Sequence, residues 1–305
     1  MHVSRPFCRF LLLLGVLAAT DGLVTARLAA QVPGGTPPAA APASPGWDFF
    51  QFVDELPDTI ADLLPDNRPK GSLRVYIRPR YGDLIRRDYL RVPVGTRWQI
   101  TENIESTAEV EGYFTHGLGG SAGDGFSGLL LGLKCEHVLS VRDDGGFSLG
   151  VNFTSPLSRP PQELTDGHRH LLPFIAATRP LLAQWQLLGY ASLGADLLQH
   201  TAMPAHFGRN ELHANSLMLS VGAAREWPRF RAALTASIAS TALVSNERRQ
   251  VFALRPEVVV PLRPAGAHTR VLLTLGGRAV WGPDGRDLGV TSSVRIETQV
   301  AGGTR

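Results

Sequence analysis

Two adjacent segments in which apolar and polar residues alternate do most to limit the folds open to this chain. They span residues 90–100 and 104–114, and a polar break at residues 101–103 separates them. Successive side chains of a β-strand point to opposite faces, so each segment would have one apolar and one charged face. A short polar break between two such runs is typical of a turn. The sequence therefore predicts a long amphipathic β-hairpin.

The alternation continues along most of the chain after residue 72 and predicts about twelve strands. We expect them near residues 72–81, 87–101, 103–116, 126–139, 146–155, 169–179, 184–199, 214–226, 229–243, 249–262, 269–281 and 287–299. Many are as long as a tilted strand that crosses the hydrocarbon of a membrane, about 9–11 residues, or longer. The pattern predicts an all-β fold, a transmembrane antiparallel up-and-down β-barrel over residues 70–300.

The expected connections mostly alternate between short and long. Short ones fall at residues 101–103, 141–145, 180–183, 227–228 and 263–268, and longer ones at 117–125, 156–168 and 200–213, with 244–248 between the two classes. Outer-membrane barrels have short periplasmic turns and longer extracellular loops. With twelve strands, this assignment places both chain ends in the periplasm.

Composition agrees with a barrel that faces lipid. The chain has 305 residues, of which 44% are hydrophobic and only 19% are charged. A soluble β-sandwich or lipocalin-like fold is the alternative, but its strands would be mostly five to six residues long. The sequence ends in Gly-Gly-Thr-Arg and lacks the aromatic residue that often ends the last strand of such barrels, which counts against the prediction. A net charge of +3 gives no reason to expect a nucleic-acid partner.

The first 69 residues differ in character from the rest. Residues 1–30 contain a basic start and an apolar run, which predict a secretory signal peptide. Residues 31–46 form a Pro/Ala-rich linker, and residues 47–66 have apolar side chains at helical spacing. This short helix either packs against the main fold or acts as a movable lumen plug or a contact for a periplasmic partner. Its candidate plug residues are Trp47, Phe49, Phe52, Val53 and Leu56.

Three stretches resemble those of a known group of outer-membrane barrels. They are residues 94–105 (VGTRWQITENIE), 125–135 (GFSGLLLGLKC) and 146–156 (GFSLGVNFTSP). The group is named for the meta pathway of phenol degradation and is described as transporter-like. The resemblance covers residues 90–156 and departs from the group's motifs at several positions, including Trp98, Gln99 and Cys135. It implies a barrel and the passage or binding of small hydrophobic or aromatic compounds, and it supplies no catalytic residues.

Charged residues on the polar faces of the first and last strands are the main site candidates. We expect the following to line the lumen: Arg74, Arg78, Arg91, Arg97, Glu105, Glu109, Glu111, Arg295 and Glu297. Closing the barrel would bring the last strand beside the first, where opposite charges can pair across strands. Such a wall either fills the interior or forms a charged constriction that selects solutes. The mixture of signs argues against strong selectivity for anions or cations.

Other chemistry has weaker support. The histidine pair His168 and His170, with Glu163 and Asp166 upstream, and the group His200, His206 and His213 are better interpreted as solvated loop residues than as metal ligands. Cys135 is the lone cysteine outside the predicted leader, so no disulfide is expected. No nucleophile motif of a lipid hydrolase occurs. We therefore expect no enzyme, no metal and no cofactor.

The sequence thus predicts an outer-membrane barrel in contact with lipid that passes or binds small solutes, hydrophobic or aromatic ones among them. A non-transporting structural barrel is the second hypothesis and a lipid-modifying enzyme the third. The substrate, the open or plugged state and the oligomeric state do not follow from the sequence.

Overall fold

A computed structural model describes residues 63–64, 69–82, 89–115, 124–136, 146–157, 159–160, 164–182, 185–205, 210–262 and 269–301. The expected signal peptide, the linker and the five candidate plug residues Trp47, Phe49, Phe52, Val53 and Leu56 lie outside these ranges. Of the segment expected to be helical, only Leu63 and Leu64 are described, and they form a turn. No helix in the described part of the chain is long and apolar enough to cross a membrane.

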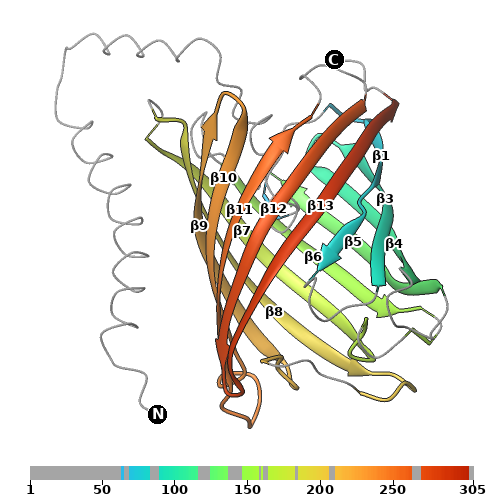
Figure 1. Ribbon diagram of the computed structural model, residues 1–305, viewed down its shortest axis with the longest axis vertical. Coiled ribbons are helices and arrows are strands. Elements are labelled where there is room, and N and C mark those ends of the chain that lie inside the picture. The colour runs from blue at the N-terminus through green and yellow to red at the C-terminus, as the bar shows by residue number, and fades with distance from the viewer. Residues whose placement is uncertain are drawn as a thin grey trace. The chain divides into compact units, whose positions relative to one another are not determined.

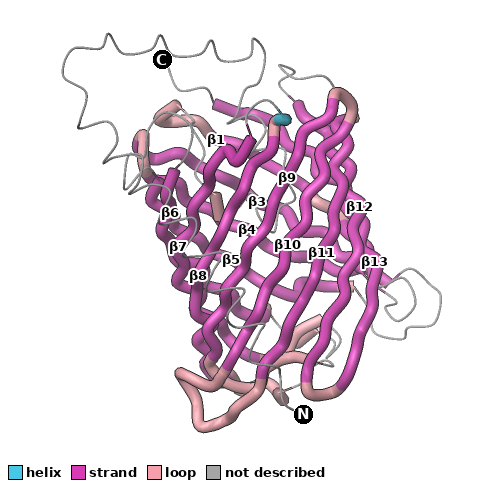
Figure 2. Tube along the Cα trace, turned by 90° about the vertical axis from the view of Figure 1, so that its left-hand side faces the viewer, coloured by secondary structure: helices cyan, strands magenta, loops and turns pink. Residues whose placement is uncertain are grey.

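The described residues form one antiparallel sheet that closes on itself (Figures 1 and 2). Its strands are β1 (Leu73–Ile77), β2 (Arg80–Gly82), β3 (Tyr89–Thr101), β4 (Ile104–Thr115), β5 (Gly125–Glu136), β6 (Gly146–Pro156), β7 (His168–Leu182), β8 (Leu187–His200), β9 (Ser216–Trp227), β10 (Phe230–Ser240), β11 (Gln250–Pro261), β12 (Thr269–Gly282) and β13 (Gly285–Ala301).

Closure of the barrel depends on β1 and β2, which share one position in the sheet. Both pair with β13 on one side and with β3 on the other, so the thirteen segments make a twelve-stranded barrel. Pro79 separates the two segments, and as a proline it has no N–H to donate to the ladder. The Arg78 amide still donates to the Pro93 carbonyl at 2.9 Å, and the Val294 amide donates to the Pro79 carbonyl at 3.0 Å. The predicted barrel of about twelve antiparallel strands is confirmed.

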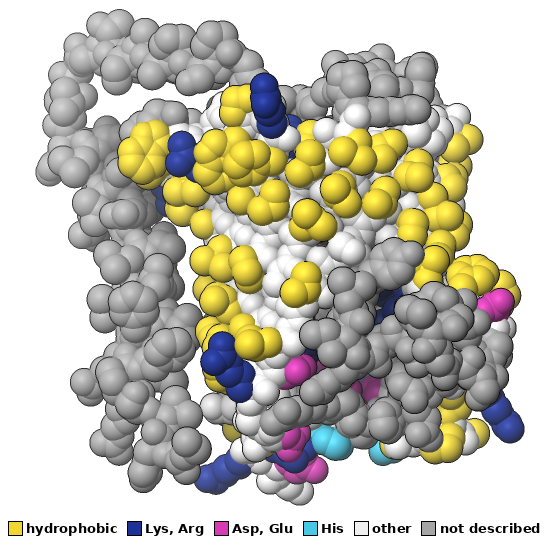
Figure 3. Space-filling model, viewed as in Figure 1, with side chains coloured by type: hydrophobic (Ala, Val, Ile, Leu, Met, Phe, Trp, Pro, Cys, Tyr) yellow, Lys and Arg dark blue, Asp and Glu magenta, His cyan; other side chains and the backbone are white. Residues whose placement is uncertain are grey.

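Apolar and charged side chains are distributed over the two faces of the barrel wall in the opposite way to a soluble protein. Large apolar side chains point outward, for example Trp98 at 49% exposure, Leu193 at 48% and Val290 at 61%. Arginine, lysine and glutamate side chains are buried inside. Figure 3 shows hydrophobic side chains spread over the outer surface, with Lys and Arg side chains near both its upper and lower edges and Asp, Glu and His side chains in its lower part. An apolar exterior around a polar interior is the arrangement of a membrane-spanning barrel.

Aromatic side chains lie near both ends of the strands. Trp227 and Phe230 stack at 4.9 Å beside the β9–β10 turn, and the Arg225 guanidinium lies 4.8 Å from the Trp227 ring centroid. Near the opposite end, Phe252 and Trp281 are 5.4 Å apart. Two aromatic groups separated along the strands match the girdles that flank the apolar band of outer-membrane barrels.

The two ends of the barrel differ in their connections. The turn end holds the β3–β4 turn and the paired residues Leu73 and Ala301, so the first and last strands begin and end there. The loop end holds the β4–β5, β6–β7, β8–β9 and β10–β11 connections. The β12–β13 turn at the loop end is only Pro283 and Asp284, which departs from the expected alternation of short and long connections, and the expected connection at residues 141–145 lies outside the described residues.

Candidate functional site

One side of the lumen, formed by β1 to β5 and β13, carries a continuous set of ion pairs that we call the charged wall. Nearest the turn end, the Arg74 guanidinium lies 2.6 Å from Glu297 and 3.4 Å from Glu105. The Lys134 ammonium lies 3.3 Å from Glu105 and 2.7 Å from Glu136. Each carboxylate in this group therefore contacts at least one cation, which is what burial of a charge requires.

The charged wall continues toward the loop end through two further groups. Arg78 lies 2.7 Å from Glu109, and the Tyr76 hydroxyl donates to the same carboxylate at 2.9 Å. Glu111 pairs with Arg80, with Arg91 at 2.6 Å, and accepts a hydrogen bond from the Ser127 hydroxyl at 2.7 Å. The cross-strand register produces these pairs, because side chains on the same face of adjacent strands lie within reach of one another.

The structure places the nine candidate lumen residues on this wall. Arg97 and Arg295 complete the set, and both lie close enough to Glu297 to interact with it electrostatically. Sequence reasoning missed Lys134 and Glu136 as members of the wall. Lys134 and Glu136 are two residues apart on β5 and so share one face of the strand, which could have indicated their position. The pairing of Glu105 with Lys134 places this face beside the glutamates of β4.

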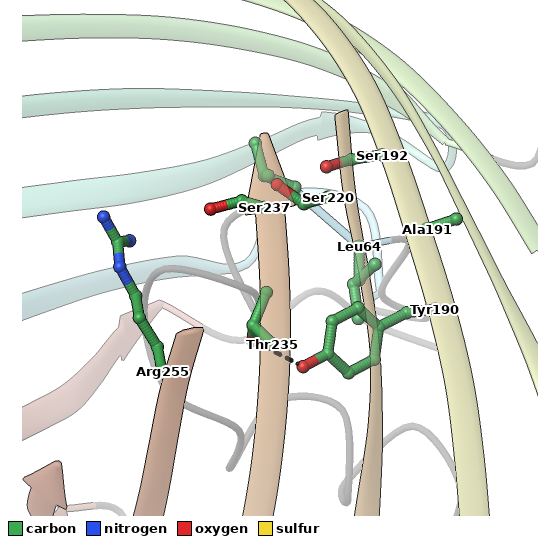
Figure 4. Close-up of a pocket in the computed structure, with 9 residues that line it drawn as sticks. Leu64, Tyr190, Ala191, Ser192, Ser220, Thr235, Ser237 and Arg255 are labelled. Atoms are coloured by element: carbon green, nitrogen blue, oxygen red, sulfur yellow. Dashed lines mark hydrogen bonds between the residues drawn. The ribbon is translucent and has the colours of Figure 1, made fainter. Parts of the chain in front are cut away.

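The other side of the lumen, on β8 to β11, carries hydroxyl groups, and we call it the hydroxyl wall. Ser192, Ser220 and Ser237 are register partners in a row across β8, β9 and β10. Beside this row, the Tyr190 hydroxyl is 2.7 Å from the Thr235 hydroxyl (Figure 4). Thr235 is paired in turn with Arg255 on β11. These residues line a cavity of about 50 Å³ together with Leu63 and Leu64.

Leu63 and Leu64 lie inside the barrel, in the half nearer the turn end. Leu64 is only 1% exposed and packs in a cluster with Phe174, Leu188 and Tyr190. Its carbonyl accepts a hydrogen bond from the Lys134 ammonium at 2.9 Å, and the Leu63 carbonyl accepts one from the Ser148 hydroxyl. The segment before β1 is therefore held against both walls.

Connections at the loop end also fold inward. Leu164, between β6 and β7, packs against Tyr113 of β4. Asn210 lies between β8 and β9. Its backbone N–H donates to the Asp284 carboxylate at 3.1 Å, and its side-chain oxygen accepts a hydrogen bond from the Asp284 backbone N–H at 3.1 Å. β10 and β11 lie between β9 and β12 in the sheet, so the contact between Asn210 and Asp284 spans these two strands at the rim of the barrel.

The histidines that the sequence left in separate loops meet at the loop end. His168 Nε2 is 2.9 Å from His200 Nδ1, and His170 contacts Asp196 at 2.9 Å and Asp166 at 3.0 Å. Burial raises the pKa of the Asp166 carboxyl, but hydrogen bonds from His170 and from the His168 amide outweigh it and hold that pKa below its usual value. Among the described residues, no group of three or more His, Cys, Asp or Glu side chains is arranged to hold a metal ion.

No model of a known protein family matches the chain, and no curated protein matches it in sequence. Among solved structures, it is similar to an outer-membrane channel from Pseudomonas putida F1. The TM-score is 0.50 and the identity 10%, over 78% of this chain and 98% of that one. It is also similar to a KdgM porin in complex with disordered oligogalacturonate, with a TM-score of 0.46 and 5% identity over 75% of this chain and 99% of that one. The fold is that of an outer-membrane β-barrel.

Proposed function

We propose that this protein is an outer-membrane channel for the passive passage of small solutes. The observation that carries the proposal is the cavity inside the closed barrel, which lies beside the hydroxyl wall and is bounded by Leu63 and Leu64. A barrel of twelve strands lies between eight-stranded barrels, which side chains largely fill, and porins of sixteen or more strands, which leave an aqueous channel. A narrow polar path is expected at this size.

The orientation follows from the connection lengths. We infer that the turn end faces the periplasm and the loop end faces the outside, as is usual for such barrels. The N-terminal leader expected from the sequence would then reach the periplasm first, and the chain would enter the lumen from that side at Leu63.

The solute class proposed from the family resemblance, small hydrophobic or aromatic compounds, has limited support from the lumen. Tyr190, Leu63 and Leu64 supply apolar surface at one side of the cavity, while the remaining lining is mostly hydroxyl and charged. Membership of the phenol-degradation group is likewise a proposal that rests on the three stretches quoted above. The solutes that fit best are small and carry both a polar and an apolar part.

A non-transporting structural barrel is the competing function, and two observations favour it. Each carboxylate of the charged wall contacts at least one cation, and Leu64 is packed inside the lumen. Such a barrel would hold its interior closed under all conditions.

Conductance in planar lipid bilayers distinguishes the two functions. We expect the full chain to give discrete conductance steps, and Leu64→Ser to give larger or more frequent steps because the side chain that packs on Leu188 and Tyr190 is lost. Leu243→Ser is the matched control, since Leu243 is 83% exposed in the β10–β11 connection. If the parent chain and Leu64→Ser both leave the bilayer insulating, the structural barrel is the correct function.

A further inference from the structure

Arg255 differs from the arginines of the charged wall in its surroundings. It projects from β11 into the cavity beside Thr235, Ser220 and Ser237 (Figure 4). Within the part of the chain that the structure describes, its guanidinium makes no hydrogen bond and no close ion pair. A guanidinium offers five donors in a fixed planar fork, so Arg255 retains donors for a ligand.

A second arginine lies beside the first. The register pairs Leu254 with Ala279 and Glu257 with Gly276, which places Arg278 of β12 next to Arg255. The two guanidinium groups and the Glu257 carboxylate interact electrostatically. The Arg278 Nε atom is buried and has no hydrogen-bond partner. Among the described residues, two cations and one carboxylate meet here, a local surplus of one positive charge.

The cavity also has an apolar side. Leu64 and the Tyr190 ring lie opposite Arg255, and Ser192, Ser220 and Ser237 lie along another side of the cavity (Figure 4). Tyr190 is held in place because its ring covers Gly222, its register partner, where a Cβ atom would collide with the ring. Ligand sites commonly combine an apolar lining with a few placed polar groups, and guanidinium forks bind planar carboxylates in two-point contact.

We propose that Arg255 and Arg278 bind the anionic group of a small organic anion whose apolar or aromatic body lies against Tyr190 and Leu64. The hydroxyl row supplies further donors along the path. This inference deepens the proposed function and rests on it, since it requires a lumen that solutes enter. It assigns to this lumen a preference for small organic anions at Arg255 and Arg278, apart from the ion pairs of the charged wall.

The size of the cavity adds a requirement. About 50 Å³ is well below the roughly 150 Å³ of an apolar cavity that holds a benzene ring. A ring-sized anion therefore displaces Leu64 from Tyr190, and removal of the Leu64 side chain favours binding. Binding of an anion at Arg255 and Arg278 is therefore coupled to movement of Leu63 and Leu64 out of the cavity.

Binding in detergent tests the site without any need for transport. The probes are benzenesulfonate and benzyltrimethylammonium, which share a phenyl ring and carry permanent charges of opposite sign. We expect saturable heat of binding for benzenesulfonate only, weakened at least about tenfold in Arg255→Gln and in Arg278→Gln, which corresponds to about 1.4 kcal/mol. Leu64→Ala should bind more tightly. Arg169→Gln, the same substitution at an exposed position on β7, is the matched control.

Liposome swelling then separates this inference from the proposed function. Arabinose should enter liposomes that contain the parent chain or either arginine variant. Benzenesulfonate should enter faster than benzyltrimethylammonium only with the parent chain and the Arg169→Gln control. Entry of arabinose with no anion binding and no anion preference overturns the arginine site and leaves the channel intact. Saturable binding without entry of any solute overturns the channel and retains the site. Equal binding of both ring probes by the parent and the arginine variants also overturns the site.

Discussion

The charged wall and the hydroxyl wall are built alike and differ in what their polar groups contact. In each wall a tyrosine ring covers a glycine on the next strand, Tyr76 over Gly95 and Tyr190 over Gly222. The Tyr76 hydroxyl donates to a carboxylate, Glu109, that also pairs with Arg78. The Tyr190 hydroxyl meets a neutral partner, Thr235. Buried ions require partners, so the charged wall is closed by its own pairs, while a wall of hydroxyls leaves donors and space for other molecules.

The largest expected effect comes from removing a charge that holds the charged wall together. Glu105→Gln leaves Arg74 and Lys134 with one carboxylate fewer, at a residue that is only 3% exposed. Loss of one partner from a buried ion pair costs about 3 kcal/mol. We expect the free energy of unfolding in urea, measured in lipid vesicles, to fall by about that amount. Thr235→Val, a change of similar size on the hydroxyl wall, should cost about 1 kcal/mol. Equal losses would remove the distinction between the walls.

A smaller effect tests the packing that both walls share. In Gly222→Ala and Gly95→Ala the new methyl group meets a tyrosine ring and a backbone carbonyl. Such crowding costs about 1–3 kcal/mol. Gly289→Ala is the matched control, because a Cβ atom there meets open space. Thermal unfolding should separate the first two variants from the control, and a Gly222→Ala protein as stable as Gly289→Ala would contradict the placement of Tyr190.

The smallest effect compares the two tyrosine hydroxyls. Tyr76→Phe removes a hydrogen bond to a charged acceptor and should cost about 2 kcal/mol, whereas Tyr190→Phe removes contacts with two neutral partners, the Thr235 hydroxyl and the Leu234 carbonyl, and should cost about 1 kcal/mol. Urea titrations of the two variants, run beside the parent, measure the difference. A larger loss for Tyr190→Phe would show that the hydroxyl wall carries the tighter network.

Much of the barrel was predictable because membrane strands impose a period of two that few other folds sustain. The run from Leu90 to Phe114 showed both faces of the wall, and the structure buries its charged residues Arg97, Glu105, Glu109 and Glu111. The break at Pro79 within the first strand was not predicted, although proline in a strand is a recognisable signal. The two-residue turn between β12 and β13 was not predicted either, because strand ends depend on neighbouring strands rather than on local composition.

The site was harder to predict than the strands. Ser192, Ser220 and Ser237 were not among the candidates from the sequence, and only the register brings them into one row. The contacts of Leu64 with Tyr190, of Leu164 with Tyr113 and of His168 with His200 join segments far apart in sequence. Such contacts depend on how the barrel closes. The alternation of apolar and polar residues predicts that a barrel forms, but it does not predict which residues meet.

The central claim is that the hydroxyl wall borders a water-filled path through the membrane, and two neighbouring residues test it most directly. Ser192 lines the cavity, while Leu193 points outward and is 48% exposed on the apolar surface. In a chain whose own Cys8 and Cys135 are replaced by serine, each residue is changed to cysteine and exposed in lipid vesicles to a charged methanethiosulfonate. We predict rapid modification in Ser192→Cys and little in Leu193→Cys. Resistance of both positions, or modification of Leu193→Cys alone, would contradict the account.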